Sequence, residues 1–191
     1  KSKNNYIILN NINLKKKIKY ENFNFIQIPK TNSMLGTIIK SQNYLKKFKN
    51  FFLTSCDCVG QFDALDLRKL ITEIDPDIVF FGFKFSNLQK NLINSHSLLS
   101  VYNKTVADIK VKHKYTNKFF GHAGYFWIKD GKIFNYLEKF KNSDYYKKTS
   151  RELLIDDYFK FLIKNKIVKT SYITLEKYIH IGSLSEYQEF I

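Results

Sequence analysis

The stretch from Asn50 to Gly60 (NFFLTSCDCVG) changes abruptly from apolar residues to small and polar ones. Its apolar half predicts a strand buried on both faces of a parallel sheet. Asp57 follows at the end of this strand, where open α/β sheets bind their ligands. A carboxylate there can hold a divalent cation, and the cation can hold phosphates. The alternative is that Asp57 caps the helix that follows, and this stretch alone favours neither interpretation.

The composition indicates one globular domain. The 191 residues are 44% hydrophobic and 17% aromatic, which is enough for a sizeable core. No apolar run approaches the length of a membrane span, and no signal-peptide pattern opens the chain. Cys56 and Cys58 are the only cysteines, too close in sequence for the disulfide framework of a secreted protein, and we expect both to be small buried packing residues. We therefore expect a cytoplasmic protein without a membrane partner.

The net charge of +15, from 32 basic and 17 acidic residues, is typical of proteins that bind nucleic acids. Arg68 and Arg151 are the only arginines, however, and the lysines are spread along the whole chain. Arginine is the residue that contacts bases and phosphates in a bidentate manner. We therefore expect no nucleic-acid partner, although a positive field would still attract an anionic nucleotide.

Strand and helix patterns alternate along the chain. Strands are expected at residues 6–9, 23–28, 50–56, 77–85, 125–128 and 168–175, with a hairpin over 98–113. Helices are expected around residues 35–48, 63–74, 133–140 and 154–162, and after 183. Asp63 can cap the second helix, and Gly82 marks a bulge or a close approach. The alternation predicts a three-layer α/β/α sandwich with a mostly parallel central sheet, in a single domain over residues 1–191.

Six segments of the chain stand out by their order: TNSMLGTIIK (31–40), FFLTSCDC (51–58), VADIKVK (106–112), GHAGYFWI (121–128), ELLIDDYFKFLIK (152–164) and KYIHIGSLSEYQEF (177–190). In this order the chain resembles the sugar-nucleotidyltransferase family, whose members join a sugar phosphate to a nucleotide. The six segments correspond in turn to the family's helix start, metal-binding strand, Glu-Lys strand, sugar-contacting turn, acidic helix and closing segment. The resemblance implies a Rossmann-like fold of the nucleotide-diphospho-sugar transferase type.

The resemblance also implies a reaction: a nucleoside triphosphate and a sugar phosphate combine and release pyrophosphate, in a surface-polysaccharide pathway. Asp57 would hold Mg²⁺, and Lys112 would neutralise the acceptor phosphate. The implied substrate-binding residues are Thr31, Gly36, Thr37, Gly121, His122, Ala123 and Gly124. Apart from the resemblance, the many lysines of the chain favour a solvated surface role for Lys112, and His122 could simply fill its turn.

The family's glycine-rich loop, which wraps the nucleotide phosphates, is absent from this sequence. The sequence opens on Lys1, and its only methionine is Met34. We therefore expect the loop to lie upstream of this sequence.

Two further departures affect the site. Val111 stands where the glutamate of the Glu-Lys pair would be. His180 stands where the family has a second metal-binding aspartate, and histidine is a poor ligand for Mg²⁺, which prefers hard oxygens. Either Asp156 or Asp157 supplies the second carboxylate, or the site keeps one protein carboxylate plus waters. The expected metal ligands are Asp57, Asp157 and His180. The alternatives are that His180 is structural and that the Asp156–Asp157 pair complements a helix N-terminus.

Two other functions stay open. One is a glycosyltransferase of the related GT-A type, which also binds a nucleotide sugar through a metal. Such enzymes usually show two carboxylates in an Asp-x-Asp pattern, whereas the Cys56–Cys58 segment has one. The other is a non-catalytic relative, which the departures at Val111 and His180 favour.

Overall fold

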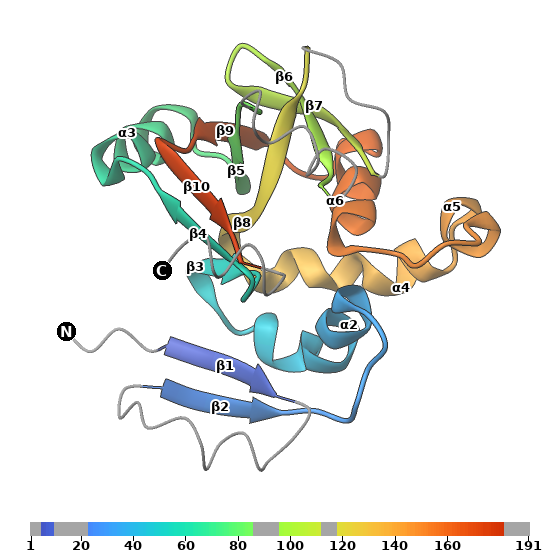
Figure 1. Ribbon diagram of the computed structural model, residues 1–191. Coiled ribbons are helices and arrows are strands. Elements are labelled where there is room, and N and C mark those ends of the chain that lie inside the picture. The colour runs from blue at the N-terminus through green and yellow to red at the C-terminus, as the bar shows by residue number, and fades with distance from the viewer. Residues whose placement is uncertain (1–4, 10–22, 86–95, 112–117, 182–191) are drawn as a thin grey trace. The chain divides into compact units, whose positions relative to one another are not determined.

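The computed structural model describes residues 5–9, 23–85, 96–111 and 118–181 (Figure 1). The chain divides into two compact units. The first comprises residues 1–48 and 131–158, and the second comprises residues 49–130 and 159–191. The expected single domain over residues 1–191 stays a prediction.

The first unit combines two short strands with several helices. Its elements are β1 (Asn5–Leu9), β2 (Phe23–Gln27), α2 (Met34–Leu45), the 3-10 helix η2 (Gly131–Tyr136), α4 (Leu137–Lys141), α5 (Asp144–Lys148) and the first turn of α6 (Ile155–Lys164). β1 and β2 pair in parallel. Leu35, Ile38 and Leu45 are buried on one side of α2, so the helical spacing expected there is confirmed.

The second unit is built on one large sheet. Its elements are β3 (Lys49–Thr54), β4 (Cys58–Gln61), α3 (Ala64–Ile74), β5 (Ile78–Phe83), β6 (Leu98–Tyr102), β7 (Thr105–Lys110), β8 (Phe120–Asp130), the later part of α6, β9 (Thr170–Thr174) and β10 (Lys177–His180). The main sheet has the order β7-β6-β8-β5-β9, with β3 also paired to β8, and β4 pairs with β10 separately.

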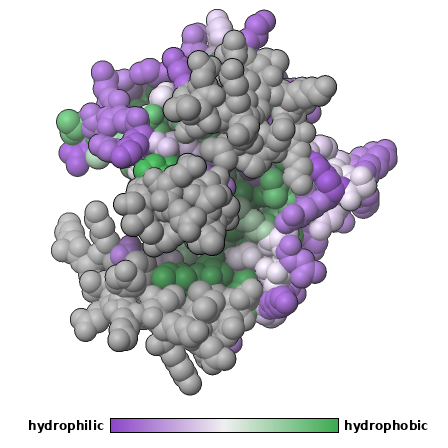
Figure 2. Space-filling view, in the orientation of Figure 1, coloured by the Kyte–Doolittle hydropathy of each residue, from purple (hydrophilic) through white to green (hydrophobic). Residues whose placement is uncertain are grey.

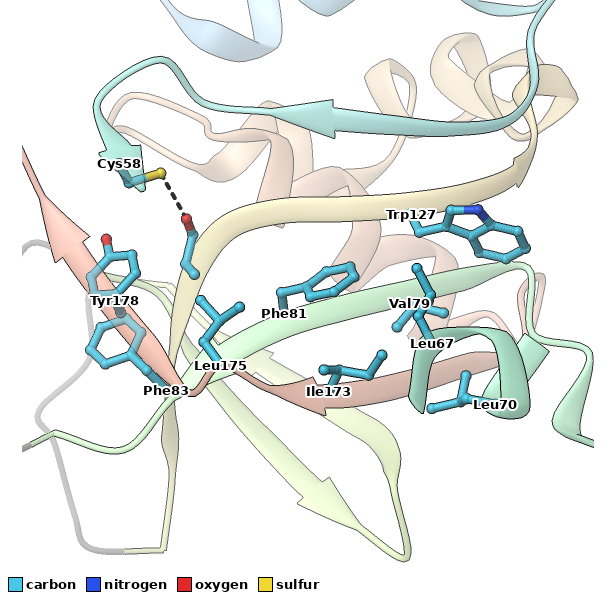
Figure 3. Packing of buried hydrophobic residues seen from close by; sticks show 11 residues of the cluster. Cys58, Leu67, Leu70, Val79, Phe81, Phe83, Trp127, Ile173, Leu175 and Tyr178 are labelled. Carbon is cyan, nitrogen blue, oxygen red and sulfur yellow. Dashed lines mark hydrogen bonds between the residues drawn. The ribbon is translucent and has the colours of Figure 1, made fainter. Parts of the chain in front are cut away.

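β5 is buried on both faces, as the apolar run from Asp77 to Phe85 predicts. Successive side chains of a strand point to opposite faces. On one face Val79 and Phe81 join a cluster with residues of α3, β9 and β10 (Figure 3). On the other face the ring of Phe80 lies 5.4 Å from Phe126 and 5.8 Å from Phe159 of α6. Helices therefore cover both faces of the sheet, which confirms the three layers.

The exposed side of α3 is mostly hydrophilic (Figure 2), although 68% of Leu65 is exposed, and the buried residues of this helix are Leu67 and Leu70. Asp63 caps this helix as expected, because its Oδ1 accepts a hydrogen bond from the N–H of Leu65 at 2.7 Å. No helix in the described part of the chain is both long and apolar enough to cross a membrane.

The expectation of a mostly parallel sheet is wrong for the described strands. β5 and β9 are parallel, but β8 runs antiparallel to β3, β5 and β6, and β6 runs antiparallel to β7. The β6–β7 connection is a two-residue turn at Asn103 and Lys104, which joins only antiparallel strands. Apolar runs reveal that strands exist and are buried, but not the direction in which their neighbours run.

β3 exists where the sequence predicts it, but it is not buried on both faces. Its side chains alternate between exposed and half-buried, and 48% of Phe52 is exposed. Among the described strands β3 pairs with β8 alone. The strand that the sheet encloses is β5, because it has β8 on one side and β9 on the other.

The segment Gly121–Gly124, expected as a turn, lies inside β8 as a bulge. Phe81 pairs with Tyr125, but the next residue, Gly82, pairs with His122, so β8 carries two extra residues. A Cβ on Gly82 would lie 2.7 Å from the carbonyl oxygen of Gly121. The close approach expected at Gly82 is therefore confirmed.

We predict that Gly82→Ala lowers the free energy of unfolding by about 2–3 kcal/mol, because the new methyl group meets a backbone atom that cannot move aside. Gly60→Ala is the control, since its Cβ would meet only side-chain atoms of Leu175 and Tyr125 at 2.9 Å, and its loss should be about 1 kcal/mol. Urea unfolding measures both. Equal losses would contradict the backbone explanation.

Candidate functional site

The connection between β3 and β4 holds Asp57 at the carboxyl end of β3. The N–H of Ser55 donates to the carbonyl oxygen of Gly124 at 3.0 Å, which ties the connection to the bulge of β8. The hydroxyl of Ser55 donates to Oδ1 of Asp57. The Asp57 side chain is 49% exposed. Asp57 does not cap α3, because Asp63 does, so the capping alternative is wrong.

Strand pairing brings His180 beside Asp57. β4 and β10 are antiparallel, with His180 opposite Cys58. The N–H of Ile181 donates to the carbonyl oxygen of Asp57 at 2.8 Å. His180 Nε2 lies 3.8 Å from Asp57 Oδ2. Two of the three expected metal ligands, from segments more than a hundred residues apart in sequence, are therefore neighbours.

His96 also belongs to this site, although the sequence analysis missed it. Its ring meets the ring of His180 edge-on, with centroids 5.2 Å apart, and lies 5.5 Å from the ring of Tyr178. Burial, and then the nearby His180 and His122, lower the pKa of His96 to about 4. It is therefore neutral at pH 7. The segment before β6 is polar and lacks periodicity, so no local pattern could reveal this position.

Tyr125 is a second residue that the sequence analysis did not assign to the site. Its hydroxyl donates to the carbonyl oxygen of Cys58 at 2.6 Å, and the thiol of Cys58 donates to the carbonyl oxygen of Ala123 at 3.0 Å (Figure 3). Burial raises the pKa of the Cys58 thiol, so this cysteine stays neutral and serves packing, as expected. Cys56, for which the same role was expected, is exposed.

The remaining residues of the β8 bulge have different surroundings. Gly121, His122 and Ala123 are buried, whereas Gly124 is half-buried and has a φ of +73°. The ring of His122 lies 4.5 Å from Phe126, and only 3% of the residue is exposed. These contacts favour the packing interpretation of His122. A sugar contact from this segment would come from its backbone.

Thr31, Gly36 and Thr37 lie in the first unit, at the start of α2. Ser33 caps this helix, because its Oγ accepts a hydrogen bond from the N–H of Gly36 at 2.9 Å. The hydroxyls of Thr31 and Thr37 are hydrogen-bonded to each other at 2.7 Å. The expected helix start is confirmed, and the substrate-binding role of these residues stays a prediction. Lys112 lies outside the described residues.

Asp157, the third expected metal ligand, lies in the first unit and is fully buried. Arg151 donates to both of its carboxylate oxygens, at 2.6 and 2.8 Å. The hydroxyl of Tyr145 donates to Oδ1 at 2.6 Å, and the N–H of Leu154 donates to Oδ2 at 2.8 Å. Each oxygen thus accepts two hydrogen bonds, as expected of a carboxylate that anchors a helix N-terminus.

A divalent cation would therefore find two donors at Asp57 and His180. No group of three or more His, Cys, Asp or Glu side chains is already gathered for a metal in the segments that the structure describes. Asp57 is half-exposed, so water or phosphate oxygens can supply the other ligands, as is usual for Mg²⁺. The carboxylate fits a magnesium ion, and the imidazole fits it poorly.

Comparisons with known proteins identify the fold. No protein-family model and no curated protein sequence matches the chain. Among solved structures, a nucleoside-diphosphate-sugar pyrophosphorylase from Vibrio cholerae RC9 has a TM-score of 0.70 at 13% identity, over 97% of this chain and 79% of that one. An inositol-1-phosphate CTP transferase from T. maritima has a TM-score of 0.62 at 15% identity, over 85% of this chain and 62% of that one. A UDP-glucose pyrophosphorylase complexed with UDP-glucose has a TM-score of 0.66 at 14% identity, over 87% of this chain and 63% of that one.

These similar structures carry the names of sugar nucleotidyltransferases. At such identities the likeness is one of fold, and this chain spans less than two thirds of the length of two of the three. The α/β fold of the nucleotide-diphospho-sugar transferase type, which the sequence resemblance implies, is confirmed.

We predict that Asp157→Asn destabilises the protein at pH 7 by about 2–4 kcal/mol, because it leaves the Arg151 guanidinium half-buried without its charge partner. Burial acts to raise the pKa of the Asp157 carboxyl, but hydrogen bonds from Arg151, Tyr145 and Leu154 outweigh it and lower the pKa. The wild-type protein should therefore lose this contribution only as the pH falls below about 4.

The test is the free energy of unfolding measured in urea from pH 7 to pH 3. The difference between wild type and Asp157→Asn should shrink towards pH 3. Asp144→Asn, in an exposed pair with Lys148, removes the same charge and should change stability by less than about 0.5 kcal/mol. A difference for Asp157→Asn that stays constant with pH would show that its charge is unimportant.

Proposed function

We propose that this protein is a sugar-phosphate nucleotidyltransferase. An oxygen of the acceptor's phosphate attacks the α-phosphorus of a nucleoside triphosphate, a new phosphorus–oxygen bond forms, and pyrophosphate leaves as the old one breaks. The observation that carries the proposal is the position of Asp57, half-exposed at the carboxyl end of β3, in a fold shared with enzymes named for this reaction.

Asp57 would hold a divalent cation, which supplies positive charge between the nucleotide and acceptor phosphates. Its carboxylate is oriented for this by the hydroxyl of Ser55 and by the hydrogen bond from Ile181 to its own carbonyl oxygen. In-line phosphoryl displacements depend mainly on positioning and on charge at the phosphates. An anchored Asp57 carboxylate would therefore contribute by holding the positive charge of the cation at the phosphates.

The other proposed roles follow the same logic. Lys112 would neutralise the acceptor phosphate. At the β8 bulge the positive φ of Gly124 lets the backbone approach the acceptor closely. Thr31, Gly36 and Thr37 are proposed substrate contacts of the first unit. For Asp157 we propose a structural role in place of metal binding, supported by the hydrogen bonds that it accepts from Arg151 and Tyr145.

The physiological setting is part of the proposal. Activated sugars made by such a reaction serve polysaccharide synthesis, and nucleoside triphosphates are supplied in the cytoplasm. We propose a cytoplasmic enzyme that serves surface-polysaccharide synthesis.

The test is pyrophosphate release by the full-length protein, with each nucleoside triphosphate and a panel of sugar phosphates. One productive pairing is expected. Asp57→Asn should lower kcat/KM by about 100-fold or more, because it removes the charge that holds the ion. Asp66→Asn, an exposed carboxylate on α3, is the matched control and should stay active.

Full activity of Asp57→Asn would overturn the role given to Asp57. Transfer of sugar from a nucleotide sugar to an acceptor, without pyrophosphate release, would identify a glycosyltransferase instead. Failure of the folded protein to bind either nucleotide or sugar phosphate would identify a non-catalytic relative.

A further inference from the structure

An open cavity lies at the end of the second unit opposite to Asp57. Its volume is about 540 Å³, and it is enclosed by the start of β7, the end of α6 and the starts of β5 and β9. β5 and β9 begin side by side, since Ile78 pairs with Thr170. Asp57 is held near their other end, because Ser55 is hydrogen-bonded to Gly124 of β8. The six residues of β5 place about 17 Å between the two ends, so the cavity is separate from the site proposed for nucleotidyl transfer.

Hydrogen bonds fix the walls of this cavity. The hydroxyl of Thr170 donates to the carbonyl oxygen of Val106 at 2.8 Å, which ties β9 to β7. The N–H of Asp77 donates to the carbonyl oxygen of Lys169 at 2.8 Å, and the N–H of Lys169 donates to Oδ2 of Asp77 at 2.7 Å. The walls are therefore preformed, and a ligand can enter with little rearrangement of the chain.

The cavity is apolar inside and positively charged at its rim. Four aliphatic residues of the lining are buried or half-buried: Val106, Ile163, Ile167 and Val168. Lys166 and Lys169 also line the cavity and are exposed, and Lys104, next to Thr105 of the lining, is exposed as well. Asp77 is the acidic residue of the lining, and its Oδ2 is already engaged by the N–H of Lys169. Two lysines and one aspartate leave the lining with a net positive charge.

Lys166 occupies a backbone position that favours glycine. At the end of α6 the N–H of Lys166 donates to Ile163 and the N–H of Ile167 donates to Leu162, both at 3.0 Å. The φ of Lys166 is +53°, which is the left-handed helix end where a Cβ is strained and glycine fits best. The rim thus carries a lysine at a cost in stability, and replacement by glycine removes its charge without straining the backbone.

We propose that this cavity binds a small amphipathic organic anion. The apolar body of the ligand rests on the aliphatic residues, and its carboxylate, phosphate or sulfonate group lies at Lys166 and Lys169. The volume is in the range of small-molecule sites. The apolar lining favours an organic ligand over a bare inorganic anion, because burial of apolar surface adds to the affinity. The lysines favour an anion over a neutral molecule of the same shape.

This inference goes beyond the proposed function, because the cavity lies apart from Asp57 and its ligand is measured without nucleotide or sugar phosphate. The test is a fluorescence titration of the full-length protein with 8-anilinonaphthalene-1-sulfonate, an amphipathic anion. N-phenyl-1-naphthylamine, which has the same rings without the sulfonate, is the matched neutral probe. We expect one sulfonate probe per chain, bound less tightly as the salt concentration rises, whereas salt should not weaken binding of the neutral probe.

Two substitutions test the lysines. Lys166→Gly should weaken binding of the sulfonate probe about threefold to fivefold and leave the unfolding midpoint equal or higher. Adding Lys169→Gln should bring the loss to about tenfold or more, and neither variant should change binding of the neutral probe by more than about twofold. Lys69→Gln, at an exposed position of α3 on the other face of the sheet, removes the same charge and should bind both probes as the wild type does.

Lysine acetylation of the wild type, followed by mass spectrometry, locates the probe without any substitution. The sulfonate probe should slow acetylation of Lys166 and Lys169 but not of Lys69. Equal affinity of wild type and double variant for the sulfonate probe, or acetylation of Lys166 and Lys169 at an unchanged rate, would overturn the proposal. Equal weakening of both probes in the double variant would overturn the selection for an anion. None of these results depends on pyrophosphate release, so the proposed function fails or holds separately.

Discussion

The burial of β5 on both of its faces is the constraint on which the second unit depends. A strand whose every residue is buried needs hydrogen-bonding neighbours on both edges and apolar cover on both faces. β8 and β9 are these hydrogen-bonding neighbours, one along each edge of β5. The cluster with α3 covers the face of Phe81, and the ring of Phe159 covers the face of Phe80. The need to pair both edges of β5 and to cover both of its faces therefore accounts for the three layers.

The candidate site arises where that regular arrangement is interrupted. Gly82 allows the backbone of Gly121 to come too close for any side chain, and β8 accommodates two extra residues at this point. The N–H of Ser55 donates to the carbonyl oxygen of Gly124, which continues the register that pairs Thr54 with Tyr125, and so holds the segment that carries Asp57. Pairing of β3 with β8 thus positions a carboxylate at the edge of the sheet.

Asp57 and Asp157 show how surroundings decide the role of a carboxylate. Asp157 is fully buried and accepts four hydrogen bonds, two of them from the Arg151 guanidinium. Its negative charge is therefore balanced within the protein. Asp57 is half-exposed and has His180 beside it, so its charge remains accessible to a cation. His122 and His96 are both buried among aromatic rings, but Nε2 of His122 lies 3.3 Å from the carbonyl oxygen of Tyr125, whereas Nε2 of His96 finds no hydrogen-bond partner among the described residues.

The sequence by itself determined the features that depend on neighbours a few residues away. The alternation of strands and helices, the cap at Asp63, the buried run of β5 and the position of Asp57 at a strand end all follow from local periodicity and turn chemistry. The order of these elements was also enough to indicate the fold, which the solved structures share.

Only the tertiary structure decided which strands run antiparallel, that β3 is partly exposed, and that Gly121–Gly124 is a bulge rather than a turn. It also decided that His180 lies beside both Asp57 and His96. The physical reason is that strand pairing and burial depend on contacts between segments far apart along the chain. No local pattern in the sequence records those contacts.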